Sequence, residues 1–130
     1  MDTPRVLILS RSAFHRRLMS DVVACNDMRP VAMSGGFSEQ LDLCGARNDV
    51  VVVDLEHSDN REGIEAVERL AALPKRTRPR IVVLVDDDHG SDVQETKAMR
   101  DAESLHGPLD VGDFARVVAR HAQEAVLASG

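Results

Sequence analysis

The chain has 130 residues, of which 43 % are hydrophobic and 29 % are charged, and its formal net charge is −6. This length and balance predict one soluble domain over residues 1–130, and a compact acidic surface argues against nucleic-acid binding. No apolar run approaches the roughly 20 residues that cross a bilayer, and the run near the N-terminus is too short for a signal peptide. Cys25 and Cys44 lack metal-ligand spacing. We therefore expect a cytoplasmic protein in a reducing compartment.

Short apolar runs alternate with longer amphipathic stretches along the chain. The runs that we interpret as strands are residues 6–9, 30–33, 50–53 and 81–85, with a brief fifth strand at Leu105. The four consecutive valines of residues 50–53 predict a central strand, because they are apolar on both faces. Pro30 predicts an edge position for the second run, since proline cannot donate a ladder hydrogen bond.

Apolar residues at helical spacing follow these runs. The predicted inward-facing residues are Phe14, Leu18, Val22 and Cys25, then Phe37, Leu41 and Cys44, then Ile64, Val67 and Ala71, and finally Val111, Phe114, Val118, His121 and Ala125. Asp110 is the predicted N-cap of the last helix, and His121 is expected to be a rim or core residue. Residues 91–99 are weakly helical, so we expect their helix to be the loosest element.

The alternation of strands and helices predicts an α/β fold, a flavodoxin-like (βα)5 three-layer sandwich with a parallel sheet. The strand order 2-1-3-4-5 places the two most apolar strands in the centre and the proline-bearing strand at an edge. In this order, ligands bind at the carboxyl ends of the strands near the switch point. The residues expected there are Ser10, Arg11, Asp54, Val85, Asp86 and residues 105–108.

These strand ends resemble the receiver (CheY-like) domains of bacterial response regulators, from Val6 to about Val126. The best local matches are residues 49–55, where the family has its phosphoacceptor aspartate, and residues 105–109, where it has a lysine-proline pair. The resemblance makes Asp54 the counterpart of the phosphorylated aspartate. It implies a role in two-component phosphorelay signal transduction.

The resemblance also implies that the residues assisting phosphorylation are largely missing. The family's metal-binding acidic pair corresponds to Ser10 and Arg11, its hydroxyl to Val85, its lysine to Gly107, its switching aromatic to Ser104, and its Met-Pro after the aspartate to residues 56–59. Because a metal, a cation and a hydroxyl must neutralise the attack of an anion on a phosphoryl group, we expect an atypical pseudo-receiver. It would be a protein-interaction module rather than an enzyme, with no cofactor. The alternative is a phosphoacceptor at Asp54 that uses Mg²⁺ and a histidine kinase.

Three hypotheses concern the neighbourhood of Asp54. Arg11 could reach the Asp54 carboxylate and replace the missing cation, or face solvent instead. The three aspartates of residues 86–88, with Asp54 or Glu56, could hold a metal, although such a triplet is more often solvated and we expect no metal. The bond between Gly107 and Pro108 is a candidate cis peptide by analogy with the family.

The fourth helix, fifth strand and fifth helix form the expected signalling surface, again by resemblance. Arg116 and Arg120, four residues apart on the last helix, and Ser104 are its candidate interface residues. The expected partner is a histidine kinase or a downstream signalling protein, with a homodimer as a further option. A nucleotide-binding domain is disfavoured because residues 10–13 contain no glycine and no P-loop motif occurs. The sequence leaves open whether an output domain follows residue 130.

Overall fold

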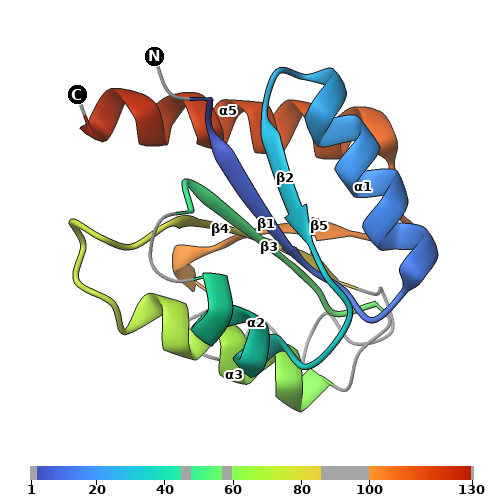
Figure 1. Ribbon diagram of the computed structural model, residues 1–130, viewed down its shortest axis with the longest axis horizontal. Helices are drawn as coiled ribbons and strands as arrows, with labels where there is room; N and C mark the ends of the chain where they lie inside the picture. Colours follow the sequence, from blue (N-terminus) through green and yellow to red (C-terminus); the bar gives the residue numbers. More distant parts are fainter. Residues whose placement is uncertain (1–2, 45–47, 57–59, 86–99, 130) are drawn as a thin grey trace.

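The computed structural model describes residues 3–44, 48–56, 60–85 and 100–129 (Figure 1). The elements are β1 (Arg5–Leu9), α1 (Ala13–Cys25), β2 (Arg29–Ala32), α2 (Phe37–Cys44), β3 (Val50–Asp54), α3 (Asn60–Ala71), β4 (Arg80–Val85), β5 (Glu103–His106) and α5 (Val111–Ser129). The predicted fourth helix, residues 91–99, and the acidic triplet 86–88 lie outside the described residues. No helix within these ranges is long and apolar enough to cross a membrane.

The strands form one five-stranded sheet with the order β2-β1-β3-β4-β5, and every neighbouring pair is parallel. This confirms the predicted α/β fold and strand order. Pro30 is the register partner of Val6, on the edge strand β2. The predicted edge position is therefore confirmed. An edge strand forms ladder hydrogen bonds with one neighbour only, so the missing N–H of Pro30 is tolerated there.

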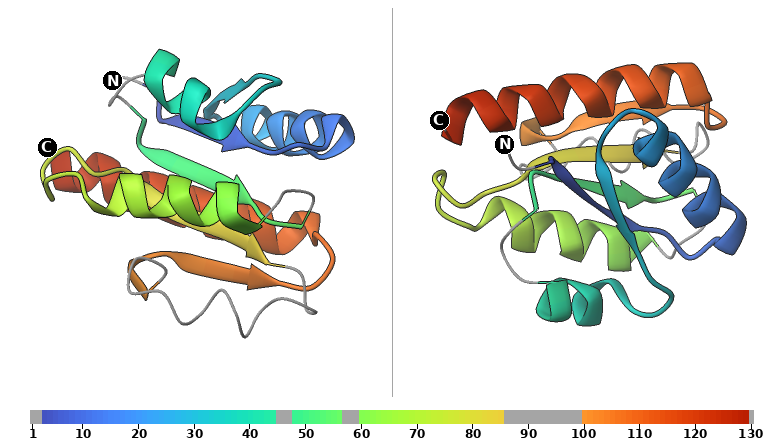
Figure 2. Two further views of the ribbon diagram at one scale, coloured as in Figure 1. Left: turned by 90° about the horizontal axis from the view of Figure 1, so that it is seen from below. Right: turned by 45° about the horizontal axis from the view of Figure 1, so that its top comes forward.

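Helices cover both faces of the sheet, with α1 and α5 on one side and α2 and α3 on the other (Figures 1 and 2). Side chains alternate along a strand, so β3 supplies both cores. Val51 and Val53 pack in the core beneath α2 and α3. Val50 and Val52 pack in the core beneath α1 and α5. The residues of β3 are all buried, as its valine run predicts for a central strand.

The inward face of α1 differs from the prediction. Met19 and Val23 are its buried residues, whereas Phe14 is 73 % exposed and Cys25 is also exposed. Two adjacent apolar stripes run along this helix, and periodicity alone does not decide which one faces the sheet. On the last helix Phe114, Val118 and His121 are buried as predicted, whereas Val111 is 42 % exposed. The Asp113 N–H donates to Asp110 Oδ1 at 2.9 Å, as expected for an N-cap.

Gly63 brings the first turn of α3 close to the end of β3. A Cβ atom at Gly63 would lie 1.8 Å from Leu55 Cδ2 and 3.2 Å from Leu55 Cγ. Leu55 is itself buried in the core beneath α3. This approach holds α3 against the strand that carries Asp54, and it requires a residue without a side chain.

We predict that Gly63→Ala lowers the free energy of unfolding by about 1–3 kcal/mol, the usual cost of overpacking a core. Urea unfolding followed by far-ultraviolet circular dichroism would measure this, since the chain has no tryptophan or tyrosine. Gly112→Ala is the matched control in the first turn of α5, where a Cβ would meet only Asp110 Oδ1 at 3.3 Å. Equal effects of the two substitutions would contradict the close approach.

Candidate functional site

The Asp54 carboxylate is fully buried at the carboxyl end of β3. The register pairs Leu9 with Val53, so the next residue of each chain segment, Ser10 and Asp54, are neighbours. Ser10 Oγ donates to Asp54 Oδ2 at 2.6 Å, and the Glu56 backbone N–H donates to Asp54 Oδ1 at 2.9 Å. A buried carboxylate must be compensated by hydrogen bonds, and both of its oxygens have a partner here.

His15 is the functional residue that the sequence analysis missed. It lies in the first turn of α1, where its backbone N–H donates to the N-cap hydroxyl of Ser12 at 3.1 Å. Its Nδ1 atom is 3.2 Å from Asp54 Oδ2, and its side chain is only 13 % exposed. No ligand spacing in the sequence pointed to His15, because its partner is 39 residues away.

Of the two alternatives for Arg11, the ion pair with Asp54 is wrong, and the side chain is 46 % exposed. Its Nε and Nη2 atoms donate to the two oxygens of Glu62 at 2.9 and 2.8 Å, in a bidentate pair. The reason is geometric: Glu62 offers two accessible oxygens in the first turn of α3, whereas the Asp54 oxygens are buried and already accept other donors. The hydrogen bond and the charge of Glu62 raise the pKa of Arg11.

Glu62 also accepts a hydrogen bond from the Phe37 backbone N–H at 3.0 Å. The Arg11 guanidinium carbon lies 5.9 Å from the centre of the Phe37 ring, within range of a cation–π contact. These three residues therefore join the end of β1 to the first turns of α2 and α3, beside the site.

The remaining predicted positions lie at the ends of β4 and β5. Val85 is fully buried and offers no hydroxyl. Gly107 has a φ of 83°, and its N–H donates to the Val85 carbonyl at 3.1 Å. The peptide bond before Pro108 is trans, so the predicted cis bond is wrong; the positive φ of Gly107 makes the turn instead. Asp86 lies outside the described residues.

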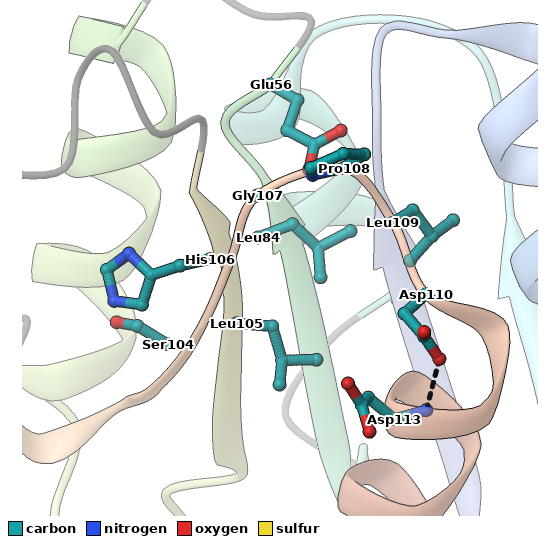
Figure 3. A pocket seen from close by; sticks show the side chains of 10 residues that line it. All are labelled: Glu56, Leu84, Ser104, Leu105, His106, Gly107, Pro108, Leu109, Asp110 and Asp113. Atoms are coloured by element: carbon teal, nitrogen blue, oxygen red, sulfur yellow. Dashed lines mark hydrogen bonds between the residues drawn. The ribbon is translucent and has the colours of Figure 1, made fainter.

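A pocket of about 120 Å³ lies beside β5 and the start of α5 (Figure 3). Ser104, Pro108 and Glu56 are among its lining residues. Small-molecule sites usually occupy about 300–1,000 Å³, so a nucleotide would not fit this pocket as described. The volume agrees with the absence of a phosphate-binding motif from the sequence.

The two arginines of the predicted interface lie exposed on α5, and both form ion pairs. Arg116 pairs with Asp113, and Arg120 pairs with Glu103 on β5. Glu103 also lies 2.8 Å from Nε2 of His121, which is buried as predicted. This cluster attaches α5 to the edge of the sheet.

The hydrogen-bond donors around Glu103 lower its pKa. Partial burial alone would raise the pKa of Glu103, but the hydrogen bonds and charges of Arg120 and His121 outweigh it and lower the pKa below its ordinary value. Arg80 Nε donates to His121 Nδ1 at 3.1 Å, and His121 Nε2 faces Glu103.

No protein-family model matches the chain, and no curated protein matches its sequence. Solved structures match its fold. The REC domain of AraT, a response regulator from Geobacillus stearothermophilus, is 24 % identical with a TM-score of 0.73, over 99 % of this chain and 100 % of that one. A response regulator receiver domain (CheY-like) from Methylobacillus flagellatus is 16 % identical with a TM-score of 0.71, over 92 % and 99 % of the two chains.

A structure described as adenylate cyclase from Rhodopirellula baltica is 13 % identical with a TM-score of 0.76, over 98 % of this chain and 93 % of that one. Identities this low show the fold alone. The chain therefore has the flavodoxin-like receiver fold, and its function has to be argued from its own residues.

We predict that Glu62→Ala lowers the free energy of unfolding by about 1 kcal/mol. The loss comes mainly from the Phe37 N–H, which loses its acceptor, because a partly exposed ion pair contributes little. Glu65→Ala is the control, since Glu65 forms only an exposed pair with Arg61 one turn away, and should cost less than about 0.5 kcal/mol. Urea unfolding of both variants tests this, and a smaller effect for Glu62→Ala than for Glu65→Ala would contradict it.

The stabilisation by Glu103 should depend on pH. Because its pKa is lower in the folded state, its contribution is fully present above the unfolded-state pKa and is lost as the pH falls through the folded-state pKa. Glu103→Gln should therefore be less stable than the unsubstituted chain at pH 7, and the difference should shrink in acid. Unfolding curves of both proteins from pH 7 to 3 measure this difference in the free energy of unfolding. A difference that does not change with pH would contradict the lowered pKa of Glu103.

Proposed function

We propose that this chain is an atypical receiver-like signalling domain of a two-component system, acting mainly through protein contacts that do not require phosphorylation. Its fold and the position of Asp54 at the end of a central strand support the receiver assignment. The proposed location is the cytoplasm. The domain is a binding module rather than an enzyme.

The main support is the state of the Asp54 carboxylate. A phosphoacceptor must present an oxygen in line with the incoming phosphorus atom. Here Oδ2 accepts from Ser10 and contacts His15, Oδ1 accepts from the Glu56 N–H, and the residue has no exposed surface. Attack would require these contacts to break first, which costs free energy before any chemistry begins.

Mg²⁺ does not fit the described residues well. This ion prefers six oxygen ligands in near-octahedral geometry and keeps several waters. The acids that would hold it are replaced by Ser10 and by Arg11, whose charge is engaged with Glu62. An imidazole nitrogen, which Mg²⁺ does not favour, lies 3.2 Å from Asp54 Oδ2.

The alternative is a working phosphoacceptor, phosphorylated on Asp54 by a histidine kinase. It is favoured by one observation: a carboxylate stands at the carboxyl end of β3, next to β1, where this fold places its chemistry. In that case the Ser10 and His15 contacts would have to open during the reaction.

The exposed side of β5 and α5 is the proposed partner surface. Arg116 and Arg120 are exposed there, and Ser104 is half-buried on β5. A histidine kinase or a downstream signalling protein is the proposed partner, with a second copy of the chain as the further option. Nucleic acid and membrane are not proposed partners, given the net charge of −6.

We predict that millimolar Mg²⁺ followed by beryllofluoride, a mimic of the phosphoryl group, leaves the amide NMR spectrum unchanged. The same titration of Asp54→Asn is the control and should give the same result. Shifts centred on Asp54, Ser10 and Gly107 that saturate with Mg²⁺ and vanish in Asp54→Asn would establish the phosphoacceptor instead.

A further inference from the structure

Three ligand-type side chains converge at the end of β3. One nitrogen or oxygen atom from each of His15, Asp54 and Glu56 lies within 4.8 Å of the other two. His15 comes from α1, and the two acids come from the end of β3 and the residues that follow it. We infer that these residues form a binding site for a divalent transition-metal ion of the Zn²⁺ type. This inference does not depend on the proposed signalling function.

The spacing is close to that of a formed site. Zn²⁺ binds nitrogen and carboxylate oxygen at about 2.0–2.2 Å, which places tetrahedral ligand atoms about 3.4 Å apart. His15 Nδ1 and Asp54 Oδ2 are already 3.2 Å apart. A carboxylate oxygen of Glu56 lies within 4.8 Å of a ligand atom of each of the other two residues, and its backbone is held by the hydrogen bond to Asp54 Oδ1.

The donor set selects the kind of ion. One imidazole and two carboxylates suit Zn²⁺, and related first-row ions also bind such sets, whereas Mg²⁺ requires oxygen ligands throughout. Three protein ligands leave a fourth position open for water or for a group of a partner. The family's magnesium site, by resemblance, uses the acidic pair after the first strand, which is Ser10 and Arg11 in this chain. The site inferred here shares Asp54 with that pocket but has an imidazole ligand, which gives it a different ion preference.

The surroundings hold the ligands in place. Ser10 Oγ donates to Asp54 Oδ2, and the Ser12 cap fixes the first turn of α1, which carries His15. Outer contacts of this kind orient metal ligands and contribute to affinity. The site therefore has a supporting shell as well as ligands.

The local charge also favours a cation. Asp54 and Glu56 bring two carboxylates together, one of them fully buried. The nearby arginines are used elsewhere, since Arg11 pairs with Glu62 and Arg16 Nη1 donates to the Ser10 carbonyl at 2.9 Å. The negative charge of the two carboxylates would attract a divalent ion at the three ligand atoms.

The test is calorimetric titration of the chain with Zn²⁺ and, separately, with Mg²⁺. We expect one Zn²⁺ per chain and no comparable binding of Mg²⁺. His15→Ala and Glu56→Gln should each weaken Zn²⁺ binding about tenfold or more. The controls are His106→Ala, which removes an exposed histidine of β5, and Cys25→Ser, which removes the exposed thiol; both should bind Zn²⁺ like the unsubstituted chain.

NMR of the His15 ring nitrogens gives a second readout, because Zn²⁺ should shift the Nδ1 resonance of His15. Unchanged Zn²⁺ affinity in His15→Ala, or loss of binding in Cys25→Ser, would overturn the inference, as would equal affinity for Mg²⁺. The two results with the substituted chains would leave the proposed function intact, since that depends on the separate response to Mg²⁺ with beryllofluoride.

Discussion

The compensation of one buried negative charge organises this end of the molecule. Asp54 ends a strand of four valines, so its carboxylate is deprived of water and depends on donors from the protein. The donors come from the residue after β1 and from the backbone after β3, and the His15 ring in the first turn of α1 also contacts the carboxylate. The Asp54 side chain thereby links the register of β1 and β3, the start of α1 and the chemistry of the site.

A second cluster is made of Arg11, Glu62 and Phe37. It holds the positive charge of Arg11 against Glu62 rather than against Asp54. A guanidinium placed one residue after Ser10 could have neutralised the buried carboxylate. The Arg11 guanidinium forms a bidentate pair with Glu62 instead. This pair, with the Phe37 N–H that donates to Glu62, joins the starts of α2 and α3 to the end of β1. The Asp54 carboxylate therefore has the His15 imidazole, rather than a guanidinium, as its neighbour.

Periodicity was sufficient to predict the fold but not the contacts within the site. The valine run of residues 50–53 predicted a central strand because it is apolar on both faces. Pro30 predicted an edge strand because its nitrogen cannot donate a ladder hydrogen bond. The direction of Arg11 and the role of His15 depend on side-chain rotamers and on partners 51 and 39 residues away. Sequence spacing carries no information on such pairs, and for the same reason it misassigned the buried stripe of α1.

The orientation of Pro30 has a consequence for association between copies of the chain. The Arg29 N–H donates to the Pro4 carbonyl, toward β1, so the alternation of a strand turns the nitrogen of Pro30 toward the open edge of the sheet. That edge therefore lacks one of the donors that an incoming strand would need. Continuous pairing of sheets across β2 is discouraged, and the chain is protected on this side against the edge-to-edge growth that leads to aggregation.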